Sequence, residues 1–304
     1  MVRGTAVVKS EFDGLGLSVL WVTPEKEAKG ILQISHGMSE YKERYLPFME
    51  YMAEQGYICV IHDHRGHGKS VYNIRELGYF YEGKNKAVVE DLHQITLWAC
   101  QMFPGLPVFL LGHSMGSLIV RNYLKYFDEE VKKVILTGPP CENPAAGLGL
   151  WIARLQKKHR SGMAPGKLLE KLSFGSFAAK FPKERSRFCW ICSDQDVVRE
   201  YEESPLCGFT FTADGYEGLL LLMKEAYSKE GWHMGNPDLP ILFLGGEDDP
   251  CIGNGRKFVK QLQHMKKTGY RHVTGKRYNG MRHEILNEKG KQEVYKNISQ
   301  FLDK

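Results

Sequence analysis

The sequence predicts an α/β fold: a mostly parallel central sheet flanked by helices, with a helical segment inserted into it. Three observations support this prediction. Short apolar runs alternate with amphipathic segments along most of the 304 residues. The alternation stops after Gly138 and resumes near residue 215, which indicates an insertion. Hydrophobic residues make up 42% of the chain and charged residues 25%, values typical of a globular domain with a large core.

The elements before the insertion follow one another in a regular order. Residues 5–23 are expected to form two short strands around the turn FDGLG. After them, buried apolar runs predict strands, and segments with helical apolar spacing predict helices. The strands are expected at 31–35, 57–63, 107–111 and 131–138, and the helices at 43–55, 86–102 and 115–127. Such alternation is typical of parallel strands joined by crossover helices.

The insertion divides the predicted domain into three segments: residues 1–139, 140–213 and 214–304. The middle segment is rich in proline, glycine and aromatic residues and contains no clear strand. In an open parallel sheet, an insertion of this kind lies over the carboxyl edge, where ligands bind. The last segment is expected to form helices at 215–229, 254–267 and 290–303 and strands at 240–245 and 272–278.

Charge and cysteine usage exclude several classes of protein. The net charge is only +5, from 41 basic and 36 acidic residues, and no long run of like charge suggests a nucleic-acid partner. The N-terminus has no sustained apolar run, and the longest aliphatic run, Leu219–Met223, is far too short to span a membrane. Seven scattered cysteines do not suggest a secreted disulfide framework. A cytoplasmic location is therefore expected.

The sequence Gly112-His113-Ser114-Met115-Gly116 fits the pattern G-x-S-x-G between a predicted strand and a predicted helix. A strand that turns into a helix within a residue or two strains the backbone of the middle residue. The flanking residues must be small because the two backbones approach closely there. The serine oxygen would then lie at the positive end of a helix dipole. The alternative is a serine that only caps the helix, with glycines forming the turn.

A nucleophilic serine needs a base and an acid, and both are expected after later strands of the sheet. Asp248 and Asp249 follow the strand at 240–245, and His283 follows the strand at 272–278. The oxyanion formed in acyl transfer also needs two backbone donors. One is the N–H after the nucleophile, on Met115, and the other is expected on Met38, after the strand at 31–35.

Two clusters could instead suggest a metal site. His62, His64 and His67 lie close together in HDHRGHG, but no carboxylate or cysteine partner is evident, so a glycine-rich structural loop is favoured. Cys189 and Cys192 have CxxC spacing, but zinc would need a second pair or suitably spaced histidines. No metal or organic cofactor is therefore expected.

Five motifs together resemble those of the α/β-hydrolase superfamily, and more narrowly its monoacylglycerol lipase and lysophospholipase-like branch. They are SHGMSEYKERY (35–45), DHRGHGKS (63–70), GHSMGS (112–117), GEDDP (246–250) and RHEILNE (282–288). The resemblance implies a carboxylic ester hydrolase that acts on single-chain glycerolipid esters. It implies Ser114 as nucleophile, His283 as general base and then acid, and Asp249 as orienting acid. Asp249 is favoured over Asp248 because the branch places its acid three residues after a glycine and often before proline.

The resemblance also makes residues 140–213 a helical cap. Within it, the helix expected at 147–160 puts Leu148, Trp151, Ile152 and Leu155 on one face, with basic residues near its end. This apolar face is expected to form a wall for an acyl chain. Packing against the protein's own domain is favoured for it, and the alternative is transient contact with an anionic membrane surface. No feature of the sequence predicts an oligomeric state.

Two other functions fit the same residues. A serine aminopeptidase or amidase would use the same triad and would need an acidic group in the cap to hold a free amino terminus. The candidates for that group are Glu142, Asp194, Asp196 and Glu202. A binding protein without catalytic activity would keep the fold alone. A haloalkane dehalogenase is disfavoured, because it needs an aspartate in place of Ser114.

Overall fold

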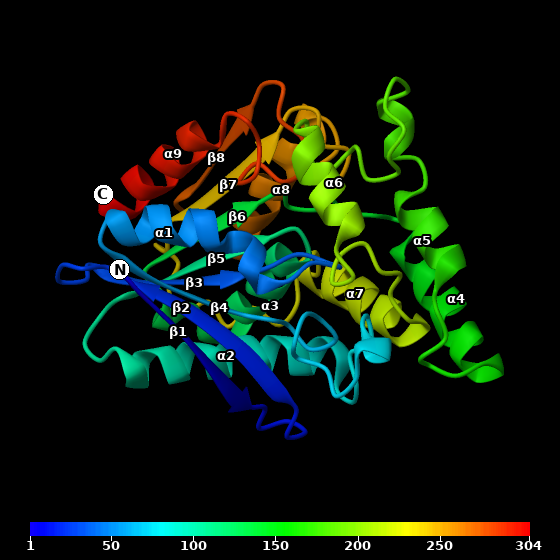
Figure 1. The fold of residues 1–304 in the computed structure, drawn as a ribbon, viewed down its shortest axis with the longest axis horizontal. Helices are drawn as coiled ribbons and strands as arrows, with labels where there is room; N and C mark the ends of the chain where they lie inside the picture. Colours follow the sequence, from blue (N-terminus) through cyan, green and yellow to red (C-terminus); the bar gives the residue numbers. More distant parts are fainter.

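Eight strands form one sheet in the order β1-β2-β4-β3-β5-β6-β7-β8 in the computed structural model, which describes residues 1–304 (Figure 1). Strand β2 is antiparallel to both of its neighbours, and every pair from β4 to β8 is parallel. The predicted fold class is therefore confirmed. The strands are β1 (Val2–Lys9), β2 (Gly16–Thr23), β3 (Gly30–Ser35), β4 (Tyr57–His62), β5 (Val108–His113), β6 (Lys133–Thr137), β7 (Ile241–Gly246) and β8 (Val273–Tyr278).

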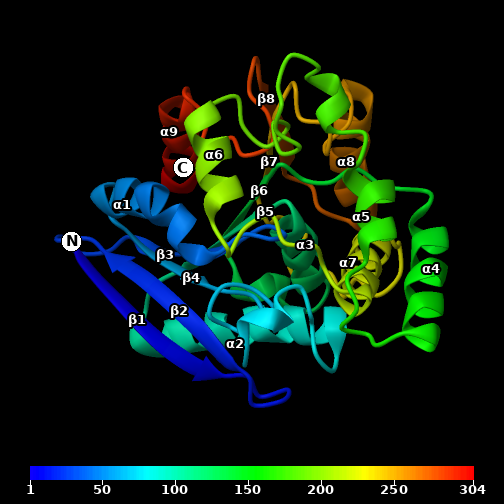
Figure 2. The ribbon, with the colours of Figure 1, turned by 45° about the vertical axis from the view of Figure 1, so that its right-hand side comes forward.

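Helices cover both faces of this sheet, α1 and α9 on one face and α2, α3 and α8 on the other (Figures 1 and 2). The helices are α1 (Leu46–Glu54), α2 (Lys84–Met102), α3 (Met115–Phe127), α4 (Ala146–His159), α5 (Lys167–Phe174), α6 (Gln195–Glu203), α7 (Ala213–Ala226), α8 (Gly255–Thr268) and α9 (Lys291–Asp303). The helix expected at 43–55 begins as a 3-10 turn, and α1 itself starts at Leu46. Pro47 lies in the first turn of α1, where its missing N–H needs no partner.

The core consists of two layers, because successive side chains of a strand point to opposite faces of the sheet. In the register of β3, β5 and β6, Ile34 lies beside Leu111, which lies beside Ile135, and all three face α1 and α9. Their neighbours Leu110 and Val134 face the opposite helices. Each such side chain contributes about 1.5–3 kcal/mol through burial. These two apolar layers fix the register between neighbouring strands. Because the strands are parallel, their carboxyl ends then lie at the same edge of the sheet.

Helices α4, α5 and α6 gather beyond this edge of the sheet (Figure 2). They lie between β6 and α7 in the chain and fall within residues 140–213, where the sequence predicts a helical insertion. None of the helices combines the length and apolarity needed to span a bilayer.

Candidate active site

Ser114 is the one residue between strand β5 and helix α3, and its backbone has a positive φ of 52°. Such a conformation is uncommon for a residue with a side chain, and it costs about 1–3 kcal/mol. The flanking glycines are required by the close approach of the two backbones. A Cβ on Gly112 would lie 2.6 Å from the carbonyl oxygen of Gly116, and one on Gly116 would overlap the carbonyl oxygen of Ser35. The turn is therefore a tight elbow that raises Ser114 above the sheet edge.

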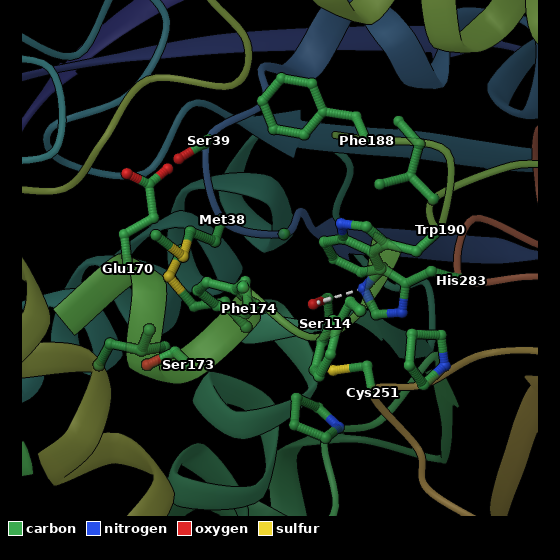
Figure 3. Close-up of a pocket in the computed structure, with 18 of the residues that line it drawn as sticks. Met38, Ser39, Ser114, Glu170, Ser173, Phe174, Phe188, Trp190, Cys251 and His283 are labelled. Atoms are coloured by element: carbon green, nitrogen blue, oxygen red, sulfur yellow. Dashed lines mark hydrogen bonds between the residues drawn. The ribbon is translucent and has the colours of Figure 1, made fainter. Parts of the chain in front are cut away.

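The structure brings Ser114, His283 and Asp249 into one hydrogen-bonded chain. Nε2 of His283 lies 2.8 Å from Oγ of Ser114 (Figure 3), and its Nδ1 lies 2.8 Å from Oδ2 of Asp249. Asp249 is buried, and its other oxygen accepts a hydrogen bond of 2.7 Å from the N–H of Cys251. Asp248, the alternative acid, is exposed. The three groups come from the loops after β5, β7 and β8, which end at the same edge.

The surroundings of His283 favour its protonated form, although the ring is buried. Burial opposes protonation, but the charge of Asp249 and the hydrogen bond to it outweigh this effect and raise the pKa of His283 above 6.5. The ring of His113 lies 4.8 Å away, centroid to centroid, and burial lowers its pKa to about 3. His113 therefore stays neutral beside an imidazole that can accept and hold a proton.

The two residues that the sequence offers as oxyanion donors, Met38 and Met115, line the cavity and have free backbone N–H groups. The N–H of Gly37 is bonded to Oε1 of Glu40 at 2.6 Å, whereas the N–H groups of Met38 and Met115 have no acceptor within the protein. Gly37 approaches the nucleophile so closely that a Cβ on it would lie 3.2 Å from Cβ of Ser114. Met38 and Met115 both line the same cavity as Ser114. These two N–H groups can therefore donate to an oxyanion.

This cavity has a volume of about 550 Å³ and is lined by 36 residues, Ser114 and His283 among them. Its volume lies within the range of about 300–1,000 Å³ usual for small-molecule sites. One apolar wall comes from α7, and aromatic side chains of the insertion form another. The ring of Trp190 lies 5.0 Å from that of His283, centroid to centroid (Figure 3). The α7 wall is formed by Leu219, Leu220 and Met223, and the aromatic wall by Phe174, Phe177, Phe188 and Trp190.

The prediction for α4 is wrong. None of the four residues Leu148, Trp151, Ile152 and Leu155 lines the cavity. Leu148 and Trp151 are each 60% exposed and Leu155 39%, while Ile152 is half-buried against the core.

The opposite face of α4 is the buried one. It consists of the smaller side chains Ala146, Leu150 and Ala153, and Gly149 lies close to Leu220 of α7. Small residues let α4 approach α7 closely, so α7 separates α4 from the cavity. Of the larger apolar face only Ile152 packs against its own domain, so the expected packing is wrong for Leu148, Trp151 and Leu155.

Sequence reasoning missed the aromatic wall and the role of α7. The four aromatic residues come from separate pieces of the insertion and share no periodicity, and only the aromatic richness of residues 140–213 pointed to them. Of the acidic groups considered for an amino terminus, Glu142 lines the cavity, and Asp194, Asp196 and Glu202 do not.

His36 and His64 connect two loops of the fold, and the thiols of the CxxC pair are not activated. Nε2 of His36 accepts a hydrogen bond of 2.9 Å from the N–H of His64, which joins the loops after β3 and β4. Burial raises the pKa of both Cys189 and Cys192, which disfavours the reactive thiolate.

One group of side chains has the spacing of a metal site. Asp249, Cys251 and His283 have donor atoms within 4.8 Å of one another. Both ring nitrogens of His283, however, are engaged by Asp249 and Ser114. The arrangement therefore fits acid–base chemistry better than metal binding.

Comparison with known proteins agrees with this chemistry. Residues 26–290 match the Hydrolase_4 family, described as "Serine aminopeptidase, S33". The chain is 24% identical over 285 residues to a monoacylglycerol lipase of Mycolicibacterium smegmatis, covering 92% of this chain and 90% of the relative. It is 24% identical over 292 residues to phospholipase YtpA of Bacillus subtilis, covering 93% and 99%. A thermostable carboxyl esterase from Bacillus coagulans, solved with glycerol, superposes with a TM-score of 0.91 at 27% identity, covering 100% and 98%.

Proposed function

The chain belongs to the serine aminopeptidase S33 family of α/β-hydrolases, and on that premise we propose that it hydrolyses single-chain lipid esters such as monoacylglycerols or lysophospholipids. The resemblance to the monoacylglycerol lipase and lysophospholipase-like branch is confirmed by these relatives. The observation that carries the proposal is the hydrogen-bonded chain from Ser114 through His283 to Asp249, with Ser114 open to a partly apolar cavity.

In the proposed mechanism, Oγ of Ser114 attacks the ester carbonyl while Nε2 of His283 takes its proton. The Met38 and Met115 N–H groups stabilise the oxyanion of the tetrahedral intermediate. The intermediate expels the alcohol, which leaves with the proton from His283, and an acyl-serine remains. Water then attacks the acyl-serine with His283 again as base, releasing the fatty acid and restoring Ser114. Asp249 holds the imidazole in the correct tautomer and stabilises its charge.

The lining of the cavity supports an amphiphilic substrate. The aliphatic side chains of α7 and the aromatic side chains of the cap suit an acyl chain. Exposed basic side chains of Lys167, Lys171 and Lys257 also line the cavity and suit a polar head group. Monoacylglycerol offers a neutral head group and a lysophospholipid offers a phosphate, so comparing the two substrates identifies which head group the cavity prefers.

The test is hydrolysis of both substrates by the purified chain and by Ser114→Ala. The variant is expected to lose about 10⁶-fold in kcat, as loss of a serine nucleophile does elsewhere. Its circular dichroism and melting temperature are expected to match the parent, because the mutation removes a single oxygen. Ser176→Ala, which changes an exposed serine that does not line the cavity, is the matched control. Activity of Ser114→Ala near that of the parent would refute the mechanism.

Glu142 favours one second candidate, an aminopeptidase, because its carboxylate lines the cavity and could pair with a free amino terminus. The two candidates separate on substrate. The ester hydrolase is expected to cleave a p-nitrophenyl ester and to leave proline naphthylamide intact. Cleavage of the amide that is lost in Glu142→Gln would instead support the aminopeptidase.

The outer face of the cap supports a further proposal, contact with an anionic membrane surface. Helices α4 and α5 lie side by side at the edge of the molecule (Figures 1 and 2). Apolar side chains stand exposed on both, and exposed basic side chains lie among them. This combination favours binding at a lipid interface. The apolar residues are Leu148, Trp151, Leu155, Leu168 and Leu172, and the basic ones Lys158, Arg160, Lys167 and Lys171.

Sedimentation with vesicles tests this proposal. The parent is expected to co-sediment with vesicles that contain phosphatidylglycerol, and less with vesicles of phosphatidylcholine alone. Trp151→Glu is expected to reduce binding while leaving hydrolysis of a soluble ester unchanged. Val259→Glu, at another exposed apolar residue, is the control. Equal binding by the parent and Trp151→Glu would contradict the proposal.

Two expectations from the sequence also stay proposals. Residues 140–213 form a cap over the cavity, which is supported by the aromatic side chains that they contribute to its lining. A cytoplasmic, reducing compartment is supported by the seven cysteines, all of which are free thiols in the structure. Cell fractionation with an antibody against the chain tests the compartment.

A further inference from the structure

Arg44 lies between the two loops that carry the proposed oxyanion donor and the proposed base. We define the oxyanion loop as residues 36–41 and the histidine loop as residues 279–290. Arg44 donates hydrogen bonds of 2.8 and 2.7 Å to the two carboxylate oxygens of Glu284, and one of 2.7 Å to Oε2 of Glu40. The side chains are 11%, 6% and 4% exposed, respectively. One largely buried cation, Arg44, therefore joins the oxyanion loop to the histidine loop.

On the oxyanion side, Glu40 fixes the peptide next to the donor. Its Oε1 accepts a hydrogen bond of 2.6 Å from the N–H of Gly37 and one of 2.8 Å from the hydroxyl of Tyr45. Gly37 immediately precedes Met38, whose N–H is the proposed oxyanion donor. The direction of that N–H therefore depends on where Arg44 holds the carboxylate of Glu40.

On the histidine side, Glu284 directly follows His283 in the chain. Its backbone N–H donates a hydrogen bond of 2.7 Å to the carbonyl of Ile191 in the cap. Its carboxylate also accepts a hydrogen bond of 2.9 Å from the side chain of Asn287. Burial disfavours a charge on Glu284, but the charge and hydrogen bonds of Arg44 outweigh burial and lower its pKa. The bidentate pair thus restricts the backbone that carries the imidazole.

The cap takes part in the same assembly through Tyr201 of α6. The guanidinium of Arg44 lies over the Tyr201 ring, 4.9 Å from its centroid. The Tyr201 hydroxyl donates a hydrogen bond of 2.9 Å to the carbonyl of Ser39 in the oxyanion loop. Helix α6 therefore contacts both the Arg44 guanidinium and the oxyanion loop, which Arg44 positions.

We propose that Arg44 is a positioning residue for catalysis: through Glu40 and Glu284 it sets the Met38 donor and His283 relative to Ser114, and through Tyr201 it couples both to the cap. The proposal rests on the proposed function. A buried ion pair is weak evidence for stability, since apolar groups of similar shape often serve as well. An arginine–carboxylate pair does, however, fix the orientation of its partners, because the planar guanidinium fork allows few hydrogen-bond geometries. Displacing a catalytic group by about 1 Å can cost about 10²-fold in rate.

Three variants separate positioning from mere support of the fold. Glu284→Gln keeps the shape but weakens the pair, Arg44→Lys keeps the charge but loses the fork, and Arg44→Met removes the charge. Each is expected to lower kcat by about 10–100-fold with a smaller change in KM. Asp238→Asn, which removes a carboxylate from the exposed pair with Arg271, is the control and is expected to behave as the parent.

The pH profile gives a signature that loss of stability does not produce. The charged and titratable groups around His283 are Asp249, Cys251, His113, Glu284, Glu40 and, beyond the two glutamates, Arg44. The acidic limb of kcat/KM is expected to move to lower pH in Glu284→Gln, because a nearby negative charge is lost. It is expected to move to higher pH in Arg44→Met, because two carboxylates lose their cation. In Arg44→Lys it is expected to stay near the parent profile.

The experiment measures kcat and KM on a p-nitrophenyl ester, per active site titrated with a fluorophosphonate, and the pKa of His283 by NMR without substrate. Lower kcat in Glu284→Gln and Arg44→Lys, with the His283 pKa lowered in Glu284→Gln, supports the proposal, even if Arg44→Met does not fold. Parent-like kcat in both Glu284→Gln and Arg44→Lys, or an unmoved His283 pKa in Glu284→Gln, overturns it. A parent without esterase activity refutes the proposed function instead. The NMR titration still tests the Arg44 bridge, because an unmoved His283 pKa in Glu284→Gln overturns it.

Discussion

Acid is expected to destabilise this protein through its buried histidines, and His62 is the clearest case. His62 ends strand β4, is fully buried, and neither of its ring nitrogens has a hydrogen-bond partner. Burial, with smaller contributions from the charges of Lys42 and Arg65, lowers its pKa from 6.5 to about 3. The unfolded state therefore binds more protons than the folded state between these two values. The stability that neutral His62 contributes is complete above about pH 6.5 and is lost as pH falls toward about 3.

The magnitude follows from proton linkage. Between about pH 7 and about pH 5, one such histidine costs roughly 2 kcal/mol of unfolding free energy. Burial also lowers the pKa of His67 to about 4 and that of His113 to about 3, so the three together cost roughly 6 kcal/mol over this interval. Whole domains are stable by only about 5–15 kcal/mol. These histidines are therefore expected to lower the unfolding free energy as pH falls from about pH 7 to about pH 5.

The perturbation is His62→Leu, an apolar side chain of similar size. The unfolding free energy is measured by urea titration with tryptophan fluorescence at about pH 7 and about pH 5, and the difference between the two pH values is expected to shrink by roughly 2 kcal/mol. Because each variant is compared with itself, any change in its stability at neutral pH cancels. His159→Gln, at an exposed histidine, is expected to keep the parent difference. A His62→Leu difference equal to that of the parent would refute the reasoning.

Three other predictions concern the elbow, the acid and the ion pairs between α7 and its neighbours. Gly116→Ala is expected to abolish fluorophosphonate labelling, because its Cβ would overlap the carbonyl oxygen of Ser35, and normal labelling would contradict the elbow geometry. Asp249→Asn is expected to lower kcat by about 10⁴-fold with little change in melting temperature, and a loss below tenfold would argue against its role. Glu217→Gln is expected to lower the unfolding free energy by about 1–3 kcal/mol in urea, because its cationic partners lose a buried carboxylate, and no loss would show that these pairs contribute little. Those partners are Lys84, Arg154 and Lys157.

Most of the fold could be predicted from the sequence, because a sheet buried on both faces produces continuous apolar runs separated by amphipathic helices. The residues of the hydrogen-bonded chain could be found for a related reason. Parallel strands end at one edge, so Ser114, Asp249 and His283 converge although they are far apart in the chain. Neither inference needed the details of packing.

What the sequence could not predict depends on packing between segments. Helix α4 has two faces that lack charge, and the spacing does not say whether the larger face with Trp151 or the smaller face with Leu150 and Ala153 turns inward. The contact with α7 decides which face of α4 is buried, and that contact joins segments that are separate in the chain. The bridge at Arg44 is similar: Glu40 lies four residues away, but Glu284 is 240 positions distant, so no local pattern reveals it.

The positive φ of Ser114 makes reactivity and thermal resistance competing properties at one residue. A glycine there would adopt the same backbone without strain, so Ser114→Gly is expected to melt at a higher temperature than the parent while losing its chemistry. Directed evolution that selects only for heat tolerance would therefore tend to discard the nucleophile. A screen on this scaffold needs turnover as a second criterion from its first round.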